Sequence, residues 1–145
     1  LPYRTDSEFE QTFLKEVLTL KEIESFGLEV YYNGDRAMTE FKIKCYKHSG
    51  TKWQYIGMYT PDFLIIQRKD GKIHKAIIVE TKGKIYANDP TFKDKRSFME
   101  SEFTKQNNQQ FGYDRFEYLY LEDVLPEKDR ITLTHQKICE FFKES

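Results

Sequence analysis

The sequence has little of what marks a metal cluster, a disulfide framework or a membrane span. Its two cysteines, Cys45 and Cys139, belong to no Cys-x-x-Cys pair and no Cys/His cluster, which argues against a zinc site. Each lies in an apolar periodic segment, so we expect two buried, reduced thiols and a cytoplasmic location. No apolar run approaches the ~20 residues that a membrane span needs, so we expect no membrane partner.

The chain also lacks a large net charge and a nucleotide-binding loop. Its formal net charge of -1 argues against a protein that binds polyanions through bulk charge. No G-x-x-x-x-G-K-[ST] motif occurs, so we expect no nucleotide-driven motor within these residues. A local basic groove is still compatible with the segment 82–96. That segment holds Lys82, Lys84, Lys93, Lys95 and Arg96 against Asp89 and Asp94.

What is present is a charged, aromatic-rich composition that fits one folded domain. The 145 residues suit a single domain over 1–145 with one core, and 12 Phe and 10 Tyr predict a core rich in rings. The chain opens Leu-Pro-Tyr-Arg without a methionine, so we expect a domain cut from a longer protein.

Hydrophobic periodicity predicts alternating helices and strands. A helix is expected over 6–23, a half-buried strand over 39–47, and a strand or an approach to one over 51–59, with Trp53 and Tyr55 in the core. Two continuous apolar strands, 62–69 and 75–82, flank an Asp70-Gly71 hairpin turn. Helix, strand and helix follow over 97–113, 115–121 and 133–144. This order predicts an α/β sandwich with a mixed sheet and helices on its faces.

Three charged residues interrupt the two apolar strands at one end. Glu80 and Lys82 are two residues apart and therefore share a face of a strand, whereas Thr81 points away. The hairpin turn lies about midway between Asp62 and Glu80, so strand pairing brings the two carboxylates close together. Burying an unpaired charge costs several kcal/mol, so these groups need a partner or a metal. The alternative is a strand end that reaches solvent, with Glu80 and Lys82 paired to each other.

This set of groups is suited to metal-assisted phosphodiester hydrolysis. Ligands that are all oxygen favour Mg²⁺ or Mn²⁺, and the backbone carbonyl of Thr81 adds one to the two carboxylates. Lys82 would then stand beside the metal, where it orients or deprotonates a water and stabilises charge on a phosphate oxygen.

The same residues resemble the PD-(D/E)xK nucleases. Pro61-Asp62 matches the PD element and Glu80-Thr81-Lys82 the (D/E)xK element. The flanking Tyr59–Phe63 and "ETKGK" segments look most like the C-terminal endonuclease domain of type III restriction enzyme Res subunits. The resemblance implies a restriction-endonuclease-like αβββαβ sandwich and Mg²⁺-dependent cleavage of double-stranded DNA, with Mn²⁺ as a substitute. It also implies a helicase/ATPase motor in the same polypeptide and a modification methyltransferase partner.

The resemblance further implies an acidic metal ligand on the first helix. Glu8 and Glu10 both fit. We choose Glu10 because it lies three and four residues before Phe13 and Leu14 and so borders the apolar side of the helix, although a capping box with Ser7 also explains it. Lys84, Lys93, Lys95 and Arg96 are candidate phosphate contacts, or residues of a solvated loop. Two alternative functions stay open: a repair or recombination nuclease on branched or single-stranded DNA, and a non-catalytic nucleic-acid-binding scaffold.

Overall fold

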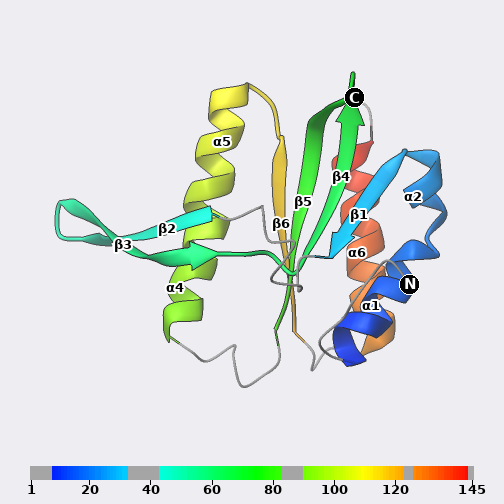
Figure 1. The fold of residues 1–145 in the computed structure, drawn as a ribbon, viewed down its shortest axis with the longest axis horizontal. Helices are drawn as coiled ribbons and strands as arrows, with labels where there is room; N and C mark the ends of the chain where they lie inside the picture. The colour runs from blue at the N-terminus through cyan, green and yellow to red at the C-terminus, as the bar shows by residue number, and fades with distance from the viewer. Residues whose placement is uncertain (1–7, 33–42, 83–89, 123–125, 144–145) are drawn as a thin grey trace.

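The computed structural model describes residues 8–32, 43–82, 90–122 and 126–143 (Figure 1). Its central sheet has four strands in the order β1-β4-β5-β6. They are β1 (Leu28–Tyr32), β4 (Phe63–Lys69), β5 (Lys72–Lys82) and β6 (Phe116–Glu122). β4 is antiparallel to β1 and β5, whereas β6 is parallel to β5. This confirms the α/β class with a mixed central sheet.

Helices cover both faces of this sheet. They are α1 (Glu8–Leu18), α2 (Lys21–Ser25), α4 (Pro90–Phe98), the π-helical η2 (Met99–Phe103), α5 (Thr104–Phe111) and α6 (Glu127–Phe142). Side chains of α1, α2 and α6 pack on one face, against Phe63, Ile77 and Val79. Side chains of α4 and η2 pack on the other, against Leu64 and Ile78. Burial on both faces explains the continuous apolar runs of β4 and β5.

A second, two-stranded sheet is formed by β2 (Ile43–Ser49) and β3 (Lys52–Tyr59). At its inner end Ile43, Cys45 and Tyr59 are buried in the cluster beneath α4, while Lys44 between them is exposed. This confirms the predicted alternation for the described residues. The outer end of the hairpin extends past α4 and α5, away from the central sheet (Figure 1).

The turn between β4 and β5 has the predicted hairpin geometry. Asp70 and Gly71 both have positive φ, 55° and 76°. A two-residue turn of this kind matches the right-handed twist of the flanking strands, and Asp-Gly is one of the few pairs that adopt it without strain. The turn therefore fixes the pairing of Lys69 with Lys72, and a register shift at Gln67/Arg68 moves the pairing by one residue before the apolar part of the two strands.

Two elements in the first third of the chain differ from the prediction: one helix is broken in two, and one strand was not predicted. The helix expected over 6–23 is broken into α1 and α2, because the N–H and hydroxyl of Thr19 both bond the Glu16 carbonyl, at 3.2 and 2.7 Å. These i→i−3 bonds end α1 in a tight turn. Strand β1 was missed. Its inward-facing Leu28, Val30 and Tyr32 alternate as a strand should, but the run is only five residues long.

Two further expectations are wrong. The helix expected from 97 begins at Pro90, so Lys93, Lys95 and Arg96 lie on α4 and not in a polar loop. Proline suits the first turn of a helix because its missing N–H has no intrahelical partner there. Trp53 and Tyr55, expected in the core, are 45% and 52% exposed, because they lie on the projecting half of the hairpin.

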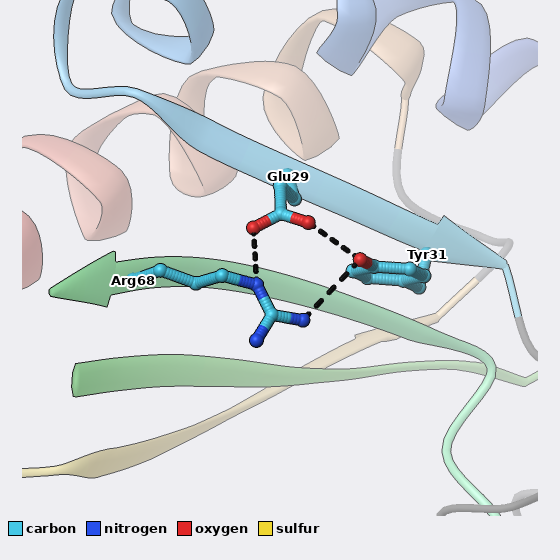
Figure 2. A network of polar contacts seen from close by, with 3 residues as sticks. All are labelled: Glu29, Tyr31 and Arg68. Carbon is cyan, nitrogen blue, oxygen red and sulfur yellow. Dashed lines mark hydrogen bonds and ion pairs between the residues drawn. The ribbon is translucent and has the colours of Figure 1, made fainter. Parts of the chain in front are cut away.

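A polar network joins the edge strand β1 to β4 (Figure 2). The Arg68 Nε donates to Glu29 at 2.6 Å, and the Tyr31 hydroxyl donates to the other oxygen of the same carboxylate at 2.5 Å. These bonds, that from Tyr31 above all, lower the pKa of Glu29. Charged side chains on an edge strand commonly prevent another strand from pairing with it and extending the sheet. We assign this network to the edge and not to a site.

No helix within the described ranges is both long enough and apolar enough to cross a membrane.

The two cysteines should differ sharply in reactivity. Burial raises the pKa of Cys45 to about 11, and its side chain is inaccessible, whereas Cys139 is partly exposed. At pH 8 only about 0.1% of a thiol with that pKa is thiolate, the form that reacts. We expect an aromatic disulfide reagent to modify one thiol quickly and the second only after unfolding. A fast phase that survives in Cys139→Ser would contradict this.

Candidate active site

The four site residues predicted on the β4–β5 hairpin gather at one end of the central sheet. Asp62 immediately precedes β4, and Glu80, Thr81 and Lys82 are the last three residues of β5. Phe63 pairs with Val79 in the antiparallel ladder, so the strand register brings Asp62 to the end of β5. β6 runs parallel to β5 and pairs Tyr120 with Glu80. The site therefore lies at the carboxyl end of the parallel pair.

Asp62 is held by the middle residue of the Glu80-Thr81-Lys82 triplet. Its Oδ2 accepts hydrogen bonds from the Thr81 backbone N–H at 2.9 Å and from the Thr81 hydroxyl at 3.1 Å. In an extended strand the N–H and C=O of one residue point toward the same neighbouring strand. The Thr81 carbonyl therefore faces the Asp62 side of β5. The carboxylate and the carbonyl proposed as ligands from sequence lie on the same side of the strand.

Glu80 is a buried carboxylate at the end of an apolar strand. Only 1% of its surface is exposed, and it follows Ile77, Ile78 and Val79, which are wholly buried. By strand alternation it lies on the face covered by α4 and η2, with Ile78. Its Oε2 accepts a hydrogen bond of 2.5 Å from the Tyr59 hydroxyl. A buried carboxylate needs such bonds, because desolvation of its charge is costly.

Tyr59 is a site residue that sequence reasoning missed. It is the last residue of β3 and is itself buried, so its hydroxyl reaches Glu80 from the second sheet. Burial raises the pKa of Tyr59 well above its usual range, and the nearby charge of Glu80 adds to that effect. Burial, followed by Glu80, also raises the pKa of Tyr118. The only sequence signal was the position of Tyr59 three residues before Asp62.

Three predicted site residues fall outside what the structure describes in full. Glu10 lies in α1 and Lys82 ends β5, but their side chains, like that of Glu8, are outside the described residues. Lys84 also lies outside the described part of the chain. The roles expected for these residues stay predictions from sequence.

The basic residues of α4 lie on the same face of the sheet as Glu80. The Arg96 guanidinium lies 3.9 Å from the ring centre of Tyr120, the β6 partner of Glu80, and also bonds Glu100 at 2.7 Å. Lys95 donates to the Met58 carbonyl at 2.8 Å. Lys93 is exposed. Arg96 and Lys95 thus have intramolecular partners, a role that sequence reasoning did not anticipate.

A different cluster of potential ligands lies on α2 and α6. The His135 Nε2 is 2.9 Å from the Glu22 carboxylate and 3.5 Å from the Cys139 sulfur. His135 and Cys139 are one helical turn apart, a spacing that we did not count as a cluster in the sequence. These helices pack on the sheet face opposite to Glu80. A sulfur, nitrogen and oxygen set is not one that Mg²⁺ prefers.

Comparison with protein-family models found no match, and comparisons with curated proteins and with solved structures found no significant match.

The raised pKa values of Tyr59 and Tyr118 predict a loss of stability in alkali. The unfolded chain releases these protons near pH 10, whereas the folded protein holds them to higher pH. Their contribution is therefore complete below pH 10 and falls as the pH rises further. Urea unfolding at pH 8, 9.5 and 11 should show this decline. It should be shallower in Tyr59→Phe and unchanged in Tyr55→Phe, whose hydroxyl is on an exposed side chain. Equal slopes in all three proteins would refute the assignment.

Proposed function

We propose that this protein is a Mg²⁺-dependent DNA endonuclease domain of the PD-(D/E)xK type. One observation carries the proposal. The Pro61-Asp62 and Glu80-Thr81-Lys82 elements, 18 residues apart in sequence, are joined by the two hydrogen bonds from Thr81 to the Asp62 carboxylate. Polar residues that only mark the ends of two neighbouring strands need not form hydrogen bonds to each other.

The arrangement of elements supports the restriction-endonuclease-like fold. Without the β2–β3 hairpin, the order is helical segment, three antiparallel strands, helical segment, and a last strand parallel to the third. This is the αβββαβ order that the resemblance implies. The hairpin is then an insertion between the first two core strands. The link to a restriction system, with a motor in the same polypeptide and a methyltransferase partner, rests on the resemblance.

The donor set fits the expected metal. The Asp62 and Glu80 carboxylates and the Thr81 carbonyl are all oxygens, which Mg²⁺ and Mn²⁺ prefer. They would hold the ion, with Glu10 as the expected further ligand. The bound ion supplies Lewis-acid activation of water and of phosphate oxygens. Tyr59 fixes the Glu80 carboxylate through Oε2. Lys82 would orient the attacking water.

A nuclease acting on branched or single-stranded DNA is the second candidate function. The observation that favours it is the exposure of Trp53 and Tyr55 on the projecting hairpin. Aromatic side chains bind unpaired bases by stacking, a contact that duplex DNA offers only at its ends. The catalytic residues are the same in both candidates, and only the substrate differs.

Removing a metal ligand should abolish cleavage. We expect Glu80→Gln and Asp62→Asn to lower the rate of plasmid cleavage in Mg²⁺ by at least about 100-fold, because a catalytic metal contributes several kcal/mol. Glu22→Gln is the matched control, since Glu22 is also a buried carboxylate but lies on α2. Calorimetric titration with Mn²⁺ should show binding to wild type and Glu22→Gln and none to Glu80→Gln. Wild type that binds no Mn²⁺, even with DNA present, would instead indicate a scaffold.

Tyr59 should support the site without touching the substrate. Tyr59→Phe removes the bond that orients Glu80, and such supporting bonds typically contribute 10–100-fold to metal affinity or activity. We expect a loss of about that size in Mn²⁺ affinity, measured by calorimetry, and a parallel loss in cleavage. Tyr31→Phe is a close control because Tyr31 donates a bond of the same length, 2.5 Å, to Glu29 at the sheet edge. Equal losses in both variants would mean a general loss of stability.

A further inference from the structure

The β2–β3 hairpin, here called the arm (residues 43–59), differs from the rest of the fold in what it exposes. Its inner end is buried under α4, but all side chains from 47 to 55 are exposed. Figure 1 shows this outer half reaching beyond the helices. An isolated two-stranded hairpin is marginally stable in water, so a projecting one with large exposed rings needs an explanation.

One face of the arm is lined by aromatic rings. The register places Tyr46 opposite Tyr55 and His48 opposite Trp53, so all four side chains share a face. The His48 and Trp53 rings are in contact at a tilt of 33°, with centroids 3.7 Å apart, and Tyr46 meets Tyr55 edge-on at 5.7 Å. Tyr46 also contacts Phe98 of α4 at 6.1 Å. The rings form a continuous row from α4 to the tip.

The arm is basic although the whole chain is nearly neutral. Residues 43–59 contain Lys44, Lys47 and Lys52 and no Asp or Glu, whereas the chain carries 23 basic and 24 acidic residues. The arm is one sheet layer thick, so these ammonium groups lie within about one Debye length, 8–10 Å, of the aromatic face. Flat rings together with positive charge are complementary to nucleic acid, whose bases stack and whose phosphates are anionic.

The base of the arm is attached to the candidate active site. Tyr59 ends β3 and donates to Glu80, and Lys95 bonds the Met58 carbonyl one residue earlier. Lys47 reaches Asp94 on α4 at 3.4 Å. A strand held on the aromatic face would therefore continue toward Asp62 and Glu80. This gives the arm a fixed position relative to the site.

We infer that the arm binds unpaired DNA by stacking bases on Trp53 and Tyr55, and guides that strand to the candidate active site. The inference deepens the second candidate function, a nuclease on branched or single-stranded DNA, and rests on it for the role of the bound strand. Unpaired DNA is the occupant because duplex base faces are already stacked on each other, so only single-stranded or frayed DNA can use the rings. A second copy of the chain is the competing occupant, since the exposed strands of the arm are also free to pair.

Trp53 is the only tryptophan and reports directly on this face. We would titrate the 145-residue chain with a dT oligonucleotide of about 12 nucleotides in EDTA, so that binding is measured without cleavage. We expect quenching of Trp53 fluorescence, and weaker binding as salt increases. A hairpin-capped duplex of the same length should leave the fluorescence unchanged.

Variants measured by anisotropy with a labelled dT oligonucleotide test the assignment to residues. Trp53→Ala and Tyr55→Ala should each weaken binding by about tenfold or more, the usual effect of removing a stacking ring, whereas Trp53→Phe should retain most of it. Leu133→Ala, on an equally exposed side chain of α6, should have no effect. Lys52→Glu should weaken binding more than Lys69→Glu, because Lys69 lies at the end of β4 opposite to Asp62. Circular dichroism confirms that each variant is folded.

Three results would overturn the inference. The first is no binding of the dT oligonucleotide by the folded wild type. The second is binding that is unchanged by Trp53→Ala and Tyr55→Ala. The third is a Trp53→Ala variant with altered oligomeric state by light scattering and unaltered DNA binding, which would make the arm a protein contact. A protein that binds through the arm but shows neither Mn²⁺ binding nor cleavage would support arm binding and refute the nuclease proposal.

Discussion

The antiparallel pairing of β4 with β5 is the constraint on which the rest of the structure depends. Its register, set by the Asp70-Gly71 turn together with the one-residue shift at Gln67/Arg68, puts Asp62 beside Thr81 and at the same time puts Ile65 and Ile77 on one face and Leu64 and Ile78 on the other. Because side chains alternate, a slip of one residue would turn the apolar sets to the wrong faces and separate Asp62 from Thr81. Core packing and the candidate site therefore stabilise the same register.

Placing polar groups at the end of this sheet reconciles stability with chemistry. The central part of β5, residues 76–79, is wholly apolar and buried, and the polar residues Glu80, Thr81 and Lys82 follow it at the carboxyl end of the strand. Glu80 is nevertheless buried, and Tyr59 reaches it from a different sheet. A carboxylate held by packed strands and a buried hydroxyl has few alternative positions, which is what a site with strict geometry requires.

The second sheet links this site to the surface. Its inner end contributes Tyr59 to the site and is fastened to α4 through Lys95, and its outer half carries Trp53 and Tyr55 into solvent. One short hairpin thus joins a buried hydrogen bond to an exposed aromatic face. The arm is also basic. The near-zero net charge of the whole chain does not reveal this, because the acidic residues lie outside the arm.

The sequence alone determined the α/β class, the hairpin turn, the buried strands β4 and β5, and the proximity of Asp62 to the Glu80 triplet. These follow from local periodicity and turn chemistry, which act between neighbours in the chain. Only the tertiary structure decided that Tyr59 bonds Glu80, that His135 meets Glu22, and that Trp53 is exposed. Those outcomes depend on which segments pack together over long sequence separations. A strand with alternating aromatic residues has the same sequence pattern whether its aromatic face is covered by a helix or exposed to solvent.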